Sequence, residues 1–435
     1  MPNFYFETSW AKFKSDPSGG LCSALVFLFP IFFLTIKGWS NGVSFILFFV
    51  AVVNITRNFK FYFFGRDKEF WIIFMVFLGP FFGELIAQTG RLSYRAASFD
   101  GPSRFVLAAV IFCFLSRQTY AKSLLRYFSI GAGLGVLATA ISVFVNSEPS
   151  LLWDGRASSY FVDPITISCF TLVLMAISLS PFWNIENDQL SLALKLIIIL
   201  CAVYVLILGA SRVAWLAGMC LFATIAIYRF TGRKLLAVVL LFCGFLILTY
   251  LTNDIFKTRI IQAHSNIYEF LSGANPDAFS ANSFGQRVQL FLLDWELIAR
   301  YPFFGVEDGW SPSLDLLRTT MPDLNWVSYR TRIVSGSHFE INAQFARQGI
   351  IGGMFSVFSL LLFPLIYIKL FSHKQKSGID LWQMFWFPYL VIVISSFAVQ
   401  VFNFKMTITF WGIFLGIILA AVYSANAQQR VTKVL

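Results

Sequence analysis

The sequence contains little charge for its length. Asp, Glu, Lys and Arg make up 13% of its 435 residues, whereas a soluble domain carries about a quarter. Hydrophobic residues make up 57% of the chain, and apolar runs recur from Leu21 to Tyr423 with one long interruption. So few charged side chains do not cover the surface of several water-soluble domains, and the composition therefore predicts a single membrane domain.

Residues that bind metals or nucleotides are also scarce. The six cysteines all lie inside apolar runs, without a CxxC pair or a neighbouring histidine, so we expect neither disulfides nor metal ligands among them. The chain has three histidines and no P-loop, no GxGxxG turn and no Asp-x-Asp pair. The sequence therefore predicts no metal and no cofactor. Residues 1–20 have no basic segment followed by a cleavable apolar one, so we also expect no signal peptide.

What the chain has instead is a series of apolar runs. A helix of about 20 apolar residues crosses a bilayer, and twelve runs are predicted to do so: 21–36, 41–56, 69–88, 104–116, 123–145, 164–182, 190–209, 212–228, 234–252, 349–371, 382–402 and 404–424. The predicted fold is an all-α polytopic membrane protein in three parts. Residues 1–252 hold about nine helices, 253–348 form one large loop, and 349–435 hold about three helices. The 52 phenylalanines and 12 tryptophans are expected on lipid-facing surfaces and in the interfacial belts.

The distribution of Lys and Arg gives an orientation. Short cytoplasmic loops carry most of these residues in membrane proteins. With the N-terminus inside, the inside segments hold Lys12, Lys14, Arg57, Lys60, Arg66, Lys68, Arg117, Lys122, Arg126, Arg229, Arg233, Lys234, Lys369, Lys374, Lys376, Arg430 and Lys433. One inside loop, residues 184–189, departs from the rule, because it carries Glu186 and Asp188 with only Lys195 nearby. The pattern places both termini in the cytoplasm and explains much of the net charge of +11 without a nucleic-acid partner.

Arginines on the outer side are not explained by that rule. They are Arg91, Arg95, Arg104, Arg156, Arg212, Arg259, Arg287, Arg300, Arg318, Arg330, Arg332 and Arg347. A guanidinium matches phosphate oxygens through two parallel hydrogen bonds, so this surplus predicts a phosphorylated lipid or a pyrophosphate as partner at the outer surface. The alternative is ion pairing inside the large loop, with Asp254, Glu269, Asp294, Glu296, Glu307 and Asp308.

Three residues are the main candidates for chemistry. Arg212 lies between two apolar spans, where a guanidinium at membrane depth is costly unless it is paired or functional. Arg287 opens a segment, 285–300, whose apolar residues recur at helical spacing and which we expect to lie on the membrane surface or to cap the site. His338 ends a polar run, and a helix beginning near Ser337 would place it on one face with Asn342. Such a histidine suits a general base, and a structural histidine is an equal alternative.

Four segments together resemble the superfamily of O-antigen ligases and polymerases. These are bacterial membrane glycosyltransferases of the GT-C type that use undecaprenyl-diphosphate sugars. Residues 155–164 are similar to its Gly-Arg motif that leads through Asp-Pro into a helix, and 208–217 to its Ser-Arg helix start. Residues 287–305 are similar to the Arg, Trp and Gly stretch of its large loop, and 338–352 to its His segment that ends in Gly-x-x-Gly. Val306 and Glu307 depart from the family, which has a second glycine after the position of Gly305.

The resemblance implies a mechanism and a location. Arg212 and Arg287 would hold the diphosphate of the donor, and His338 would take the proton of the acceptor hydroxyl in a metal-independent, inverting transfer. Further site residues that it makes candidates are Arg156, Asp163, Asn342, Arg91 and Arg95. The protein would lie in the bacterial inner membrane with its active site facing the periplasm.

Three functions fit these expectations. The leading one is an O-antigen ligase, which transfers polysaccharide from undecaprenyl diphosphate to lipid A-core, and the outer arginines favour it because that acceptor is phosphorylated. The first alternative is an O-antigen polymerase, whose acceptor is another undecaprenyl-linked repeat. The second is a transporter or flippase for the same lipid-linked glycans. The absence of paired similar halves and the single long loop argue against this last function.

Overall fold

The computed structural model describes residues 17–118, 120–146, 156, 158–183, 188–272, 283–306, 339–372, 376–397, 401–402 and 404–434. Within these ranges the chain is helical and contains no strand. The helices up to the large loop are α2 (Pro17–Ile31), α3 (Trp39–Arg57), α4 (Phe59–Phe63), α5 (Lys68–Arg91), η1 (Ala96–Phe99), α6 (Asp100–Leu115), α7 (Ala121–Val145), α8 (Pro164–Ser178), α9 (Asp188–Gly209), α10 (Arg212–Arg229) and α11 (Gly232–Thr252). They are followed by α12 (Asp254–Leu271), α14 (Ser283–Arg300), α17 (Glu340–Val357), η4 (Phe358–Leu362), α18 (Phe363–Ser372), α19 (Lys376–Ser395) and α20 (Lys405–Val434).

Ten helical segments of the described chain are long and apolar enough to cross a membrane. They are α3, α5, η1 with α6, α7, α9, α10, α11, α17 continued through α18, α19 and α20. Two shorter apolar helices, Ser18–Ile31 and Pro164–Ser178, overlap the two remaining predicted spans. The polytopic helical fold is thus confirmed in outline, whereas the full count of twelve spans and the side on which the large loop lies stay predictions.

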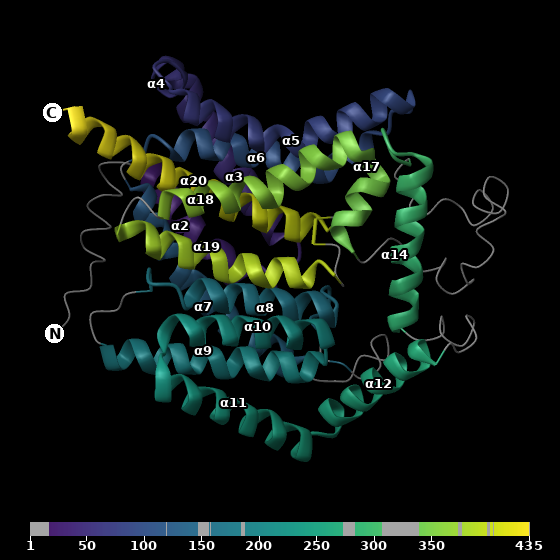
Figure 1. Ribbon diagram of the computed structural model, residues 1–435. Helices are drawn as coiled ribbons and strands as arrows, with labels where there is room; N and C mark the ends of the chain where they lie inside the picture. The colour runs from purple at the N-terminus through teal and green to yellow at the C-terminus, as the bar shows by residue number, and fades with distance from the viewer. Residues whose placement is uncertain are drawn as a thin grey trace.

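Helix α20 lies at the centre of the bundle and α11 at its edge (Figure 1). The apolar part of α20 is 94% buried against α3, α6, α7 and α18, while Thr249 is the one buried residue of α11. The Phe410 ring of α20 packs on Phe33 at 4.5 Å and on Phe29, Phe128 and Phe170 at 5.7 to 5.8 Å between centroids. Many phenylalanines therefore fill the interior, and the expectation that they serve mainly lipid-facing surfaces was incomplete.

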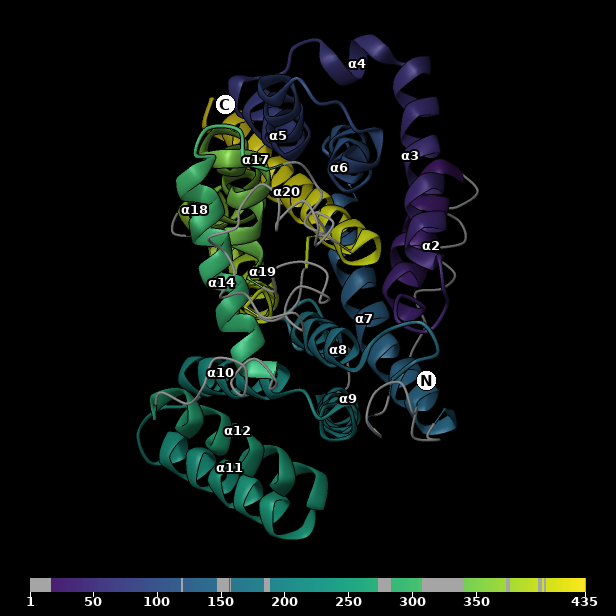
Figure 2. The ribbon, with the colours of Figure 1, turned by 90° about the vertical axis from the view of Figure 1, so that its right-hand side faces the viewer.

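Two helices of the large loop run across one end of the bundle. Figure 2 looks onto this end, with α14 standing upright and α12 lying below it beside α11. The predicted helix 285–300 is confirmed as α14. Helix α12 was not predicted, because its polar residues interrupt the apolar runs used to find the other helices. At the other end of the bundle Arg66 donates to Ser116 at 2.9 Å, and Asn426 donates to Glu69 at 2.8 Å.

The start of α17 also differs from the prediction. The helix begins at Glu340 rather than near Ser337, since Phe339 precedes it with extended backbone angles of φ −98° and ψ 94°. The same helix is broken at Gly349, the first residue of the predicted C-terminal part, where φ is 66° and ψ is −180°. The chain that follows α14 fits into this break, because Ile350 N donates to Pro302 O at 2.7 Å and Val306 N to Ala346 O at 2.8 Å.

Replacing Gly349 by alanine is expected to destabilise the protein. A Cβ atom there would lie 2.2 Å from Phe303 O, and the backbone conformation is one that L side chains rarely adopt. The conformational strain alone amounts to about 1–3 kcal/mol, and the clash adds to it. Thermal unfolding in detergent should show a lower midpoint than for Gly42→Ala or Gly244→Ala, two helical glycines with no atom within 4 Å of the added Cβ. Equal midpoints for the three variants would contradict the assigned packing.

Candidate functional site: an arginine cluster under the loop helices

The first arginine of the cluster is held by a tight joint between two helices. Ala210 adopts a left-handed conformation with φ 47°, which ends α9 and turns the chain into α10. Ser211 is the N-cap of α10, and its Oγ accepts from Ala214 N at 3.3 Å. Arg212 is therefore the first residue of α10 and has a half-buried side chain. The break predicted between the two apolar spans thus consists of Ala210 and Ser211 alone.

Arg287 approaches the same place from α14. Its side chain is half-buried, and burial lowers the pKa of its guanidinium, as do the nearby positive charges of Arg212 and Arg156. An arginine remains protonated at neutral pH even so. Three arginines that were candidates from the sequence are therefore close enough to repel one another: Arg156, Arg212 and Arg287. They come from three separate stretches of the chain.

Helix α12 adds a fourth arginine. Arg259 is within electrostatic range of Arg212, and Gln262 connects the two. Its Oε1 accepts from Arg212 Nη2 at 3.3 Å and from Arg259 Nη1 at 3.2 Å. This set of Arg156, Arg212, Arg259 and Arg287 is called the arginine cluster below.

Three of the four arginines have no carboxylate partner within the described part of the chain. Arg212, Arg259 and Arg287 make no ion pair with any carboxylate that the structure describes, whereas Arg300 at the far end of α14 pairs with Glu296 at 2.9 Å. Pairing inside the loop therefore accounts for Arg300 but not for these three. Guanidiniums gathered without counter-charge favour an anion, because each one gains most from an oxyanion placed between them.

Asp163 caps a helix close to the arginine cluster. It is the N-cap of α8, and its Oδ1 accepts from Ile165 N and Thr166 N, both at 2.9 Å. The Asp-Pro pair thus starts a helix, as the sequence motif indicates. A Cβ added at Gly209 would lie 3.2 Å from Pro164 O, so the start of α8 packs directly beside the joint that carries Arg212.

Arg91 and Arg95 belong to a different group of residues. Arg91 Nη1 donates to Phe304 O at 2.6 Å and to Arg347 O at 2.7 Å, which fastens the end of α5 to the chain after α14. The backbone N of Arg95 donates to Gln88 Oε1 at 2.8 Å, while its side chain is exposed. The structure thus gives Arg91 a role in holding the backbone and does not bring these two residues to the arginine cluster.

A buried carboxylate organises this second group. Glu84 of α5 is completely buried, and its two oxygens accept from Gln88 Nε2 at 2.8 Å and Gln348 Nε2 at 2.9 Å. The guanidiniums of Arg91 and Arg347 each approach it to 3.9 Å. We call these five residues the Glu84 network, and it joins α5 to the part of α17 that precedes the Gly349 break.

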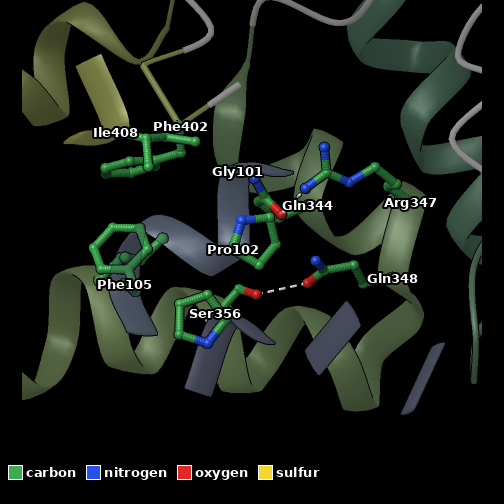
Figure 3. Close-up of a pocket in the computed structure, with 11 residues that line it drawn as sticks. Gly101, Pro102, Phe105, Gln344, Arg347, Gln348, Ser356, Phe402 and Ile408 are labelled. Carbon is green, nitrogen blue, oxygen red and sulfur yellow. Dashed lines mark hydrogen bonds between the residues drawn. The ribbon is translucent and has the colours of Figure 1, made fainter. Parts of the chain in front are cut away.

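A narrow crevice lies next to the Glu84 network (Figure 3). One wall is polar and consists of Gln344, Arg347, Gln348 and Ser356 of α17, where Ser356 Oγ donates to Gln348 Oε1 at 2.6 Å. The rest of the lining is apolar and is formed by Pro80, Gly101, Pro102, Phe105, Leu360, Phe402 and Ile408. The crevice is small, so it is part of the packing between α5, α6 and α17 rather than a substrate chamber.

Two predicted site residues remain. Asn342 of α17 is buried, and its Nδ2 finds no hydrogen-bond partner in the described residues. His338 lies outside the described residues, so its predicted role is untested. No three His, Cys, Asp or Glu side chains come together as metal ligands in the described ranges. All six cysteines lie in the described residues and none forms a disulfide, and Cys243 is exposed on α11.

The sequence did not single out Glu84 or Gln262, and it treated Arg259 only as one outer arginine among many. A signal for Glu84 was present, since a carboxylate inside an apolar span marks a functional or structural site by default. Gln262 carries no such signal, because its partners come together only through folding. No protein-family model matches the chain, and no curated protein matches it significantly.

Proposed function

We propose that this protein is an O-antigen ligase, a membrane glycosyltransferase that transfers polysaccharide from undecaprenyl diphosphate to lipid A-core at the periplasmic face of the inner membrane. The observation that supports this function most is the convergence of four arginines at one end of an apolar helical bundle. Three of them, Arg212, Arg259 and Arg287, make no ion pair with a described carboxylate. A lipid diphosphate has the matching chemistry, since its tail enters the apolar phase while its phosphates reach the end of the helices.

The cluster would act on the leaving group. When the bond from the anomeric carbon to the diphosphate breaks, negative charge grows on the phosphate oxygen that departs. Guanidiniums already directed at this oxygen stabilise the charge without having to reorganise. Such electrostatic stabilisation is the largest single contribution to the rate in many enzymes. Arg287 suits this task because its guanidinium is more deeply enclosed than that of Arg212, and burial strengthens its field.

His338 would accept the proton of the acceptor hydroxyl as that oxygen attacks the anomeric carbon and inverts it. His338→Ala is expected to lower the rate of transfer by about 10²- to 10⁴-fold, the usual contribution of a positioned general base. Binding of undecaprenyl diphosphate should stay unchanged, because the phosphates rest on the arginines. His264→Ala, at the exposed histidine of α12, is the matched control. Transfer at the wild-type rate by His338→Ala would remove this residue from the mechanism.

A strain that lacks the gene distinguishes the ligase from its alternatives. Full-length glycan that accumulates on undecaprenyl diphosphate is the result expected of a ligase, whereas lipopolysaccharide capped by a single repeat would indicate a polymerase. Purified protein in vesicles with both substrates supplies the second test. If it moved the lipid-linked glycan across the bilayer and formed no glycosidic bond, the protein would be a transporter and the proposal would fail.

A further inference from the structure

Helix α12 is fixed against the start of α10 by an aromatic contact. The Phe256 ring lies 4.4 Å from that of Trp215 between centroids, and Phe256 is buried. Trp215 in turn donates from Nε1 to Leu206 O at 2.9 Å. Arg259 follows Phe256 by three residues and therefore lies on the same face of α12, while Gln262 reaches α10 through its hydrogen bond with Arg212.

The hydrogen bonds of Gln262 indicate which kind of group the space between Arg212 and Arg259 favours. Two positively charged guanidiniums share one neutral amide oxygen, at 3.3 Å from Arg212 and 3.2 Å from Arg259. The amide carries only a partial negative charge, so the repulsion between the two arginines is only partly offset. An ionised phosphate oxygen at the same place would accept shorter and about twice as strong hydrogen bonds from both.

We propose that Arg259 is a further diphosphate-binding residue, and that a phosphate oxygen displaces the Gln262 carbonyl between Arg212 and Arg259 when the diphosphate binds. This inference depends on the proposed function, which assigns the diphosphate to the arginine cluster. It makes the loop helix α12 a part of the donor site and gives Gln262 the role of an internal competitor for the phosphate position.

Binding measurements on the full chain in nanodiscs test the proposal. The probes are undecaprenyl diphosphate in the bilayer, undecaprenyl monophosphate in the bilayer, and inorganic pyrophosphate in solution. Arg259→Ala should weaken the binding of both diphosphates about tenfold, which corresponds to ~1.4 kcal/mol, and affect the monophosphate less. Lys257→Ala is the matched control, since it removes the same charge from an exposed position on the same helix.

Gln262 gives the sharper test. In Gln262→Glu a carboxylate takes the place between the two guanidiniums. Diphosphate binding should therefore weaken by more than the tenfold (~1.4 kcal/mol) expected for Arg259→Ala. Gln262→Ala removes the competitor and should bind at least as tightly as the wild type. His264→Glu introduces the same charge at an exposed position two residues further on and is expected to bind nearly normally.

The results separate this inference from the proposed function. If Arg259→Ala and Gln262→Glu bound both diphosphates like their controls while Arg287→Ala lost them, the role of α12 would be refuted and the arginine site would stand. If Arg212→Ala and Arg287→Ala also bound undecaprenyl diphosphate normally, the proposed function would fail as well. A loss of pyrophosphate binding alone would overturn the assignment to a lipid.

Discussion

Replacing Arg287 by alanine is expected to lower glycan transfer by about 10²- to 10³-fold, the effect of removing one donor that stabilises a developing oxyanion. The reason is its position, because the guanidinium lies half-buried next to the positive charges of Arg212 and Arg156. The loss should appear both in the binding of undecaprenyl diphosphate and in kcat. Arg287→Lys is expected to recover only part of it, since a lysine keeps the charge but loses the paired hydrogen bonds of the fork.

The control for this prediction lies on the same helix. Arg300 ends α14 in a partly exposed ion pair with Glu296, and ion pairs near the surface contribute about 0–1 kcal/mol. Arg300→Ala removes the same charge from α14 and should leave transfer within a small factor of the wild type. Equal rates for Arg287→Ala and Arg300→Ala would show that the cluster does not act on the leaving group.

The largest effect on stability is expected at Glu84. Glu84→Ala leaves the guanidiniums of Arg91 and Arg347 and two amide donors without the carboxylate that they surround. Removing one partner of a buried charged group costs about 3–5 kcal/mol. Unfolding in detergent should show this loss, and limited proteolysis should cleave the chain between α14 and α17 faster, because Arg91 fastens that chain to α5.

Two further variants define the cause. Glu84→Gln keeps the shape and one acceptor oxygen, so it should lose less stability than Glu84→Ala. Glu296→Ala removes a carboxylate of the same kind from a side chain that is 41% exposed, and it should change stability by about 1 kcal/mol or less. If Glu84→Ala unfolded at the same midpoint as Glu296→Ala, the Glu84 network would not hold α5 and α17 together.

The sequence was informative where a signal lies in neighbouring residues. An apolar run of sufficient length is helical in a bilayer whatever surrounds it, so each predicted span overlaps a helix. Asp163 before Pro164 and Ser211 before Arg212 are helix starts that the family resemblance implied, and the structure confirms both as local caps. The start of α17 was misplaced by three residues, since it is set by contacts with other elements, such as the bond from Glu340 N to Ser396 O. Helix α12 was missed because its mixed polarity resembles that of a loop.

What the sequence determined by itself is thus the all-helical class, most helix positions, and the identity of three of the four clustered arginines as candidates. Which arginines share a site was decided by the tertiary structure alone. Arg212 and Arg287 come together while Arg91 is drawn into the Glu84 network, although all three were candidates of the same kind. The physical reason is that a guanidinium's role depends on the charges and acceptors around it, and these belong to helices far apart in the chain.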